Sequence, residues 1–123
     1  MLEFQEMDSH ATYLEQLQQH GDGPVVLINT FTVPADQVER AIEVWAHDAA
    51  FMQRQPGLVS SQLHRGAAGS STLINVAEWE SAAALRHAFT RPEFQARLSH
   101  YPDGTIASPH LFTTVAVPGI CDG

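Results

Sequence analysis

A nine-residue apolar run enclosed by two prolines constrains the fold of this chain more than any other feature. Residues 25–33 read VVLINTFTV and lie between Pro24 and Pro34. The run is short and rich in β-branched side chains, which is typical of a strand and not of a helix. Because it has almost no polar alternation, we expect a central strand whose faces are covered.

The residues after this strand change to a helical period. Apolar side chains recur at the spacing of one helix face between residues 34 and 54; they are Val38, Ala41, Ile42, Trp45, Ala49 and Met52. Two further strands are predicted over residues 58–65 and 71–79. The glycine-rich sequence GAAGS separates them, so the pair is expected to be a hairpin.

The last third of the chain predicts a second helical region and a fourth strand. Ser81 is a suitable N-cap for a helix, and Thr90 is a suitable cap for a second helical segment with Pro92 in its first turn. The final strand is predicted over residues 110–117. The resulting order of elements is βαββαβ, which indicates a ferredoxin-like α+β fold with both helices on one face of an antiparallel sheet.

Three segments are expected along the chain. Residues 24–118 form the ferredoxin-like domain, and residues 119–123 form a tail. Residues 1–23 are an N-terminal extension with an extra helix, capped by Asp8 or Ser9. The second face of the sheet needs a cover that so short a chain hardly provides, so a homodimer with packed sheets is predicted.

Charge and cysteine content exclude several classes of function. The formal net charge is −8, and all six basic residues are arginines spread along the chain, so no basic stripe is present to bind nucleic acid or an anionic membrane. The single Cys121 rules out a disulfide framework within one chain. The N-terminus is acidic, and no apolar run approaches the ~20 residues that span a bilayer. We therefore expect a cytoplasmic protein with no nucleic-acid or membrane partner.

Seven histidines raise the question of a metal site. They form no HxH, HxxxH or HExxH pattern, so no metal centre is predicted. Four are expected on solvated helix surfaces: His10, His20, His47 and His100. His64 and His87 are either solvated as well or candidates for a proton acceptor in a pocket, because histidine titrates near neutral pH.

Two asparagines and a tryptophan stand out within the apolar strands. Asn29 lies in the first predicted strand and Asn75 in the third, and these two strands are normally neighbours in this topology. An unpaired buried amide costs ~1–3 kcal/mol. The amides therefore bond to each other or to a buried water, or they face a ligand cavity. Trp79 shares a strand face with Asn75 and carries an N–H donor, which suits a planar oxygenated aromatic ligand.

The asparagine of the first strand, together with the sequence NVAEWES at the end of the third, resembles the antibiotic biosynthesis monooxygenase family. The resemblance covers residues 25–117 and includes FMQRQPGLVSSQLHR and RPEFQARL. It implies a dimeric α/β barrel. It also implies that O₂ oxidises a polycyclic aromatic polyketide, of the anthrone or naphthacenone type, to a quinone without a metal, a flavin or another cofactor.

The resemblance assigns expected roles to individual residues. Asn29 and Asn75 would donate hydrogen bonds to a substrate oxyanion, and Trp79 would stack on or hydrogen-bond the substrate or its peroxide. His64 stands near the place of a pocket tyrosine and is the fourth candidate catalytic residue. The candidate substrate-binding residues are Trp45, Phe31, His87 and Phe89, and Arg91 and Arg97 are candidates for a pocket arginine.

Two other functions stay open at this point. The same fold hosts polyketide cyclases, which also need a pocket, a general base and a donor that stabilises an enolate. Alternatively, an accessory protein could use the cavity only to hold an apolar ligand. The haem-degrading branch of the superfamily shares the first-strand asparagine. Its tryptophan and histidine would fall near Ala88 and Leu98 here, so the haem ligand is missing.

Overall fold

The computed structural model describes residues 2–19 and 21–123, so the predicted surface position of His20 lies outside the described residues. Five strands form one sheet in the order β1-β5-β2-β4-β3. They are β1 (Glu3–Phe4), β2 (Val25–Thr32), β3 (Leu58–Arg65), β4 (Thr72–Trp79) and β5 (Ile106–Phe112). The helices are α1 (Tyr13–Leu17), α2 (Val38–Gln53), α3 (Ala82–Phe89) and α4 (Pro92–Arg97), with 3₁₀ turns η1 (Ala35–Gln37) and η2 (Leu98–His100).

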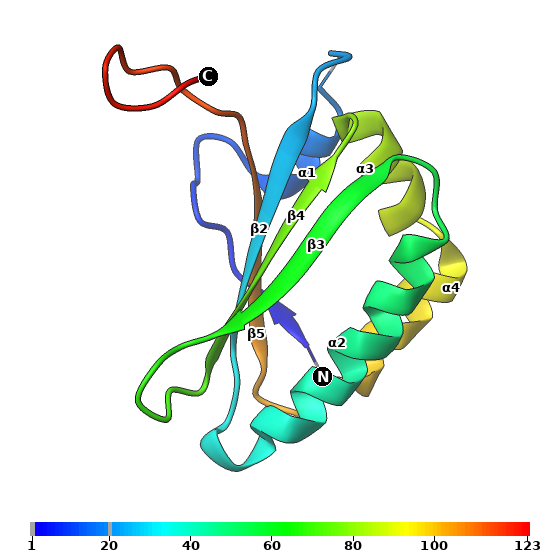
Figure 1. Cartoon of the computed structure of the whole chain (residues 1–123). Helices are drawn as coiled ribbons and strands as arrows, with labels where there is room; N and C mark the ends of the chain where they lie inside the picture. The colour runs from blue at the N-terminus through cyan, green and yellow to red at the C-terminus, as the bar shows by residue number, and fades with distance from the viewer. Residues whose placement is uncertain (1, 20) are drawn as a thin grey trace.

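The predicted ferredoxin-like α+β fold is confirmed. β2 is the central strand and runs antiparallel to both β4 and β5, while β3 and β4 form the predicted hairpin. Helices α2, α3 and α4 lie on one side of the sheet (Figure 1). In the described part of the chain, no helix is long and apolar enough to cross a membrane.

The register between β2 and β4 decides which side chains meet. Asn29 is directly opposite Asn75, so the two amides share a face of the sheet. Residues two positions away on that face, Phe31 and Ala77, are buried under the helices. The alternate residues, such as Ile28, point to the other face and are only half-buried.

Most of the buried apolar residues form two separate clusters. One gathers around Trp79, Leu17 and Leu85, and the other around Phe31, Leu73 and Tyr101. Neither cluster contains Asn29 or Asn75, which lie midway along their strands. The amides therefore interrupt the apolar layer between helices and sheet.

The last strand lies earlier than predicted. β5 ends at Phe112, and residues 113–117 continue outside the sheet, with Val115 71% exposed. The predicted strand begins at residue 110, whereas β5 already includes Pro109. This proline is tolerated because Ala107 and Leu111, two residues away on either side, direct their backbone groups to the outer edge of β5. The missing N–H of Pro109 therefore also falls on that edge, where no ladder bond is lost.

The N-terminal segment, predicted as an extension, contributes side chains to the core. Its helix begins after Thr12, which forms a capping box with Glu15, and not after the predicted Asp8 or Ser9. Tyr13 and Leu17 are buried in the Trp79 cluster, whereas Leu14 is 61% exposed. β1 also pairs in parallel with the start of β5. The domain boundary at residue 24 stays a prediction.

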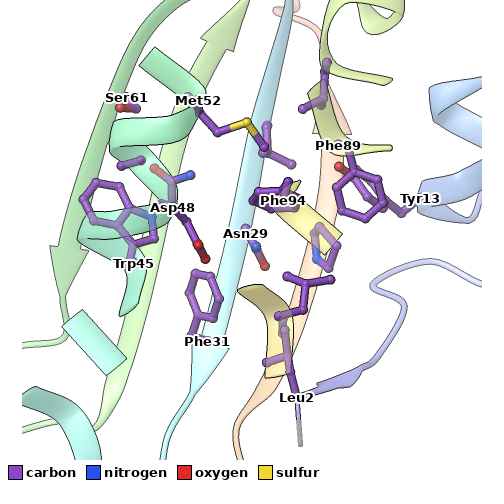
Figure 2. A pocket seen from close by; sticks show the side chains of 18 of the residues that line it. Leu2, Tyr13, Asn29, Phe31, Trp45, Asp48, Met52, Ser61, Phe89 and Phe94 are labelled. Carbon is purple, nitrogen blue, oxygen red and sulfur yellow. The ribbon is translucent and has the colours of Figure 1, made fainter. Parts of the chain in front are cut away.

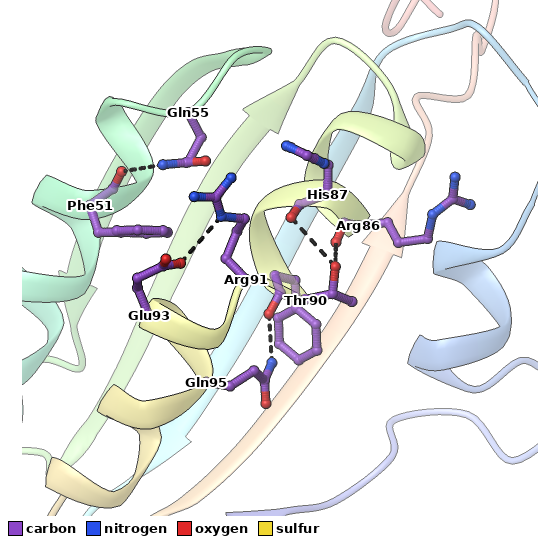
Figure 3. Close-up of polar contacts among 9 residues, drawn as sticks. Phe51, Gln55, Arg86, His87, Thr90, Arg91, Glu93 and Gln95 are labelled. Carbon is purple, nitrogen blue, oxygen red and sulfur yellow. Dashed lines mark hydrogen bonds and ion pairs between the residues drawn. The ribbon is translucent and has the colours of Figure 1, made fainter.

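At the α3–α4 junction, α4 follows α3 over the sheet (Figure 3). Ser81 caps α3 as predicted, by accepting from the backbone N–H of Ala84. Thr90 does not cap α4; its hydroxyl donates to the backbone oxygen of Arg86, so it closes α3 instead. Pro92 occupies the first turn of α4 as predicted.

Candidate active site

A cavity lies between the helices and the sheet, and it is lined by residues from both core clusters (Figure 2). Its open volume is about 80 Å³, which is several times what one water molecule requires. Most of the lining is aliphatic or aromatic. The side chains that bring polar atoms are Tyr13, Asn29, Trp45, Asp48, Ser61, Asn75, Trp79 and Tyr101.

Asn29 and Asn75 both line this cavity, as their shared face requires. The Oδ1 atom of each amide is buried and has no hydrogen-bond partner among the described residues. The two amides therefore do not satisfy each other, which was one of the alternatives raised by the sequence. Each unpaired oxygen destabilises the protein by ~1–3 kcal/mol unless something in the cavity donates to it.

Trp79 lies four residues beyond Asn75 on the same face of β4 and also lines the cavity. It is 1% exposed, and its Nε1 has no acceptor among the described residues. A buried indole N–H normally finds a partner. The cavity thus combines amide oxygens that can accept with an indole nitrogen that can donate.

Three of the predicted substrate-binding residues border the cavity: Phe31, Trp45 and Phe89. Phe31 stacks on Tyr101 with ring centroids 5.5 Å apart, and Phe89 meets Tyr13 edge to face at 5.2 Å. Aromatic rings therefore line the cavity on the sheet, on α2 and at the end of α3. Such walls suit a flat aromatic ligand.

The two candidate histidines do not lie at the cavity. Leu63 of β3 is opposite Asn75, so the next residue, His64, points to the opposite face of the sheet, where it is exposed. His87 is exposed on α3, whose buried residues are Ala82, Leu85 and Ala88. The structure thus corrects the expected placement of both side chains.

Asp48 is a cavity residue that the sequence analysis missed. It lies on α2, is 5% exposed and lines the cavity; Figure 2 shows it projecting from α2 toward the side of β2 that carries Asn29. Burial raises the pKa of the Asp48 carboxyl to about 6. A signal was present in the sequence, because Asp48 stands at helical spacing between Val44 and Phe51, both buried.

Polar neighbours keep the Asp48 carboxyl ionisable. A hydrogen bond from the Tyr101 hydroxyl and the charges of Arg97, His100 and His47 lower its pKa, although burial is the larger effect. Burial also raises the pKa of Tyr101 far above its usual range, so this phenol stays a donor. At neutral pH the cavity therefore holds a carboxylate whose Oδ1 has no hydrogen-bond partner among the described residues.

The described residues offer little to a metal or a haem. No group of three or more histidine, cysteine or acidic side chains in this part of the chain could hold a metal ion. The described lining of the cavity contains neither histidine nor cysteine. Ala88 is buried and Leu98 borders the cavity, so the two positions compared with the haem-degrading branch carry apolar side chains.

Two characterised proteins are similar in sequence to part of this chain. Over 70 residues the chain is 37% identical to deoxynogalonate monooxygenase from Streptomyces nogalater, covering 57% of this chain and 58% of that protein's length. Over 77 residues it is 32% identical to a mycobilin-producing heme oxygenase from Mycobacterium tuberculosis, covering 63% of this chain and 73% of that protein.

Solved structures share the fold across nearly their whole length. A candidate monooxygenase from Shewanella loihica has a TM-score of 0.69 and 37% identity, and the match covers 80% of this chain and all of that one. SnoaB, a cofactor-independent oxygenase from Streptomyces nogalater, has a TM-score of 0.67 and 28% identity, with 79% and 98% covered. Residues 24–97, more than half of the chain, match the family's own sequence pattern. The chain belongs to the antibiotic biosynthesis monooxygenase family.

Proposed function

We propose that this protein is a cofactor-independent monooxygenase that oxidises a polycyclic aromatic polyketide, of the anthrone or naphthacenone type, to a quinone with O₂. One observation carries the proposal. In the described residues, five buried polar side-chain atoms lack a partner, and four of them belong to residues that line the cavity: Asn29, Asp48, Asn75 and Trp79. Such concentration points to a ligand with its own donors and acceptors, because buried polar groups are normally paired.

The chemistry of this substrate class needs no redox cofactor. The ring CH₂ of an anthrone is acidic, and its enolate is electron-rich enough to reduce O₂ directly. One electron passes to O₂, the resulting radical and superoxide combine to a peroxide, and loss of water leaves a carbonyl. The sum is anthrone plus O₂ to quinone plus water. The protein has to bind the ring system, favour the enolate and exclude bulk water.

The cavity residues suit these tasks. Asn29 and Asn75 each offer an amide N–H₂ donor and an oxygen acceptor, which fits a substrate with an enolate oxygen and phenolic hydroxyls. Preorganised donors at a developing oxyanion are the type of group whose loss lowers a rate by roughly 10²–10³. In this proposal the Trp79 N–H donates to the substrate or to the peroxide.

Binding a polycycle requires the cavity to widen. Its volume of about 80 Å³ is smaller than the ~300–1,000 Å³ of a typical small-molecule pocket. Met52 on α2 lines the cavity (Figure 2), and methionine adapts its shape with little strain. We propose that Met52 and the partly buried Leu98 move aside when the substrate enters.

Oxygen uptake with an anthrone as substrate tests the proposal. The purified protein should consume one O₂ per quinone formed, and prior treatment with a chelator should not change the rate. Quinone formation that requires an added metal or flavin contradicts the cofactor-independent chemistry. Binding of the anthrone without O₂ uptake contradicts the oxygenase and favours a ligand-binding protein.

A polyketide cyclase is the second candidate function. The observation in its favour is Asp48, because a carboxylate beside two amides also serves an enolisation that does not involve O₂. Under anaerobic conditions a cyclase converts its substrate to a ring-closed isomer at full rate, whereas the oxygenase forms no product. This measurement separates the two enzymes.

A further inference from the structure

Asp48 lies at the boundary between two openings in the structure. Its inner side faces the cavity with Asn29 and Asn75. It also lines a second cleft between α2 and the α4–η2 segment, whose lining residues are Arg40, Val44, His47, Asp48, Arg97 and His100. One carboxyl group therefore borders both the substrate cavity and a cleft that carries cationic and titratable side chains.

The groups around this carboxyl come from three parts of the chain. Arg40 and His47 belong to α2, Arg97 ends α4, His100 ends η2, and Tyr101 follows it. Tyr101 hydrogen-bonds to the carboxyl from the cavity side, and Arg97, His100 and His47 favour its ionised form. These groups stabilise the Asp48 carboxylate, so that it can act as a base in an apolar cavity. The cationic side chains among them do not line the cavity itself.

We infer that Asp48 is the proton carrier of the reaction: it removes the acidic ring proton of the substrate and returns it to the peroxide. The inference rests on the proposed function. When the C–H bond breaks, its electron pair stays on the substrate as the enolate, and the proton forms an O–H bond with Asp48. After the enolate has reduced O₂ and the peroxide anion has formed, the proton passes from Asp48 to the terminal peroxide oxygen.

The second half of the reaction uses the same carboxylate again. Asp48 removes the remaining proton from the oxygenated carbon, the O–O bond breaks, and hydroxide leaves and takes up that proton as water. The quinone carbonyl forms, and Asp48 ends as the carboxylate with which it began. The outer cleft lets the proton held on Asp48 exchange with solvent between these steps.

Hydrogen exchange of an anthrone in D₂O without O₂ isolates the first proton transfer. The wild-type protein should accelerate deuterium incorporation at the ring CH₂, as followed by NMR. Asp48→Asn should lose about 10²–10⁴ of this acceleration, the range that a general base contributes. The control is Glu39→Gln, which removes an exposed carboxylate from the same helix and should leave exchange unchanged.

The pH dependence provides a readout that survives even if Asp48→Asn fails to fold. Exchange by the wild-type protein should fall as the pH drops through about 6, because the carboxyl then becomes protonated. A flat wild-type profile from pH 5 to 8, or full exchange by folded Asp48→Asn, overturns the inference.

The two proposals fail in different ways. O₂ uptake by the wild-type protein without any acceleration of anaerobic exchange overturns the role of Asp48 and leaves the oxygenase standing. Exchange that depends on Asp48, together with absent O₂ uptake, overturns the oxygenase and supports Asp48 as a base.

Discussion

At the scale of single residues, the two amides that lie opposite each other on β2 and β4 weaken the core. Asn29 and Asn75 interrupt an apolar layer in which their neighbours on the same face are buried. Apolar side chains at these positions would join the two clusters and fill the cavity. The amides therefore maintain an open polar site at the expense of stability, which is common where function and stability compete.

Asn75→Ala should lower the turnover of an anthrone-type substrate by about 10²-fold, because it removes a donor to the developing oxyanion. His64→Ala is the matched control, since His64 is exposed on the opposite face and should keep wild-type turnover. Steady-state O₂ uptake and thermal unfolding are measured on both variants. A stability loss in Asn75→Ala with unchanged turnover per folded molecule would show that the amide is only structural.

Trp79→Phe should keep the aromatic packing of a side chain that is 1% exposed and remove its N–H. We expect turnover to fall more than the free energy of unfolding, because Nε1 has no protein acceptor among the described residues to lose. Equal substrate affinity with a lower kcat would indicate a contact made in the transition state. Unchanged kcat and KM would exclude a role for the indole N–H.

Asp48→Asn should raise the free energy of unfolding at pH 7 by about 1–2 kcal/mol, because the folded protein disfavours the ionised carboxyl. Its pKa of about 6 in the folded state lies above the ordinary 3.8. The folded state therefore binds more protons between these values, and the contribution of Asp48 to stability is lost as the pH rises from about 4 to about 6. Urea unfolding of both proteins at pH 4.5 and 7 measures the difference. A wild-type advantage that grows with pH contradicts it.

At the scale of elements, the N-terminal segment packs against the helix and the strand that position the site. Tyr13 contacts Phe89, which lines the cavity, and Arg86 of α3 donates to the backbone oxygen of Leu17. Gln16 binds both backbone groups of Leu111. Helix α1 thus fixes α3 relative to β5, although the family match begins only at residue 24.

Leu17→Ala should reduce the free energy of unfolding by about 2–4 kcal/mol, because it leaves a cavity at a side chain that is 1% exposed. Leu14→Ala is the matched control on the same helix. Leu14 is 61% exposed, so its truncation should change stability by less than ~0.5 kcal/mol. Equal effects in urea unfolding would show that α1 is not anchored through Leu17.

The sequence predicts the elements well where local signals agree with the fold. The proline-bounded β2 and the helical period of α2 need no tertiary information. The most buried face of α2 is nevertheless shifted from the predicted stripe, because it includes Val44 and Phe51 while Trp45 and Met52 are only half-buried. β5 was misplaced because tolerance of Pro109 depends on which edge its backbone faces, and this depends on distant pairing. Asp48 was missed because a charge on an apolar stripe gives no local sign of its neighbours from α4 and η2. His64 was misassigned because a register between strands decides its face.

At the scale of the whole molecule, the sheet has one face that α2, α3 and α4 leave uncovered (Figure 1). Ile28 of β2 and Val76 of β4 lie opposite each other on this face and are half-buried. Exposed apolar residues continue with Phe112 at the end of β5 and with Val115 beyond it. These surfaces support the proposed homodimer with sheets packed face to face.

Ile28→Glu should convert the proposed dimer to a monomer, because it places a charge in an apolar interface. The wild-type protein is expected to elute at twice the 13.5 kDa of one chain when its mass is measured by light scattering at micromolar concentration. Gln53→Glu adds the same charge at an exposed position of α2 and should leave the dimer intact. A monomeric wild-type protein contradicts the prediction.

The outer edge of β5 has a consequence for how copies of this chain can associate. Its outward-facing backbone positions offer little to a new strand. Gln5, next to β1, donates to the Ala107 oxygen, Pro109 has no N–H, and the Gln16 side chain binds both backbone groups of Leu111. At the other edge, the register of β3 shifts between Leu58 and Ser60, and such irregularities discourage regular pairing. Sideways growth of the sheet into an aggregate is therefore hindered at both ends. The uncovered face is then the surface left for the proposed homodimer.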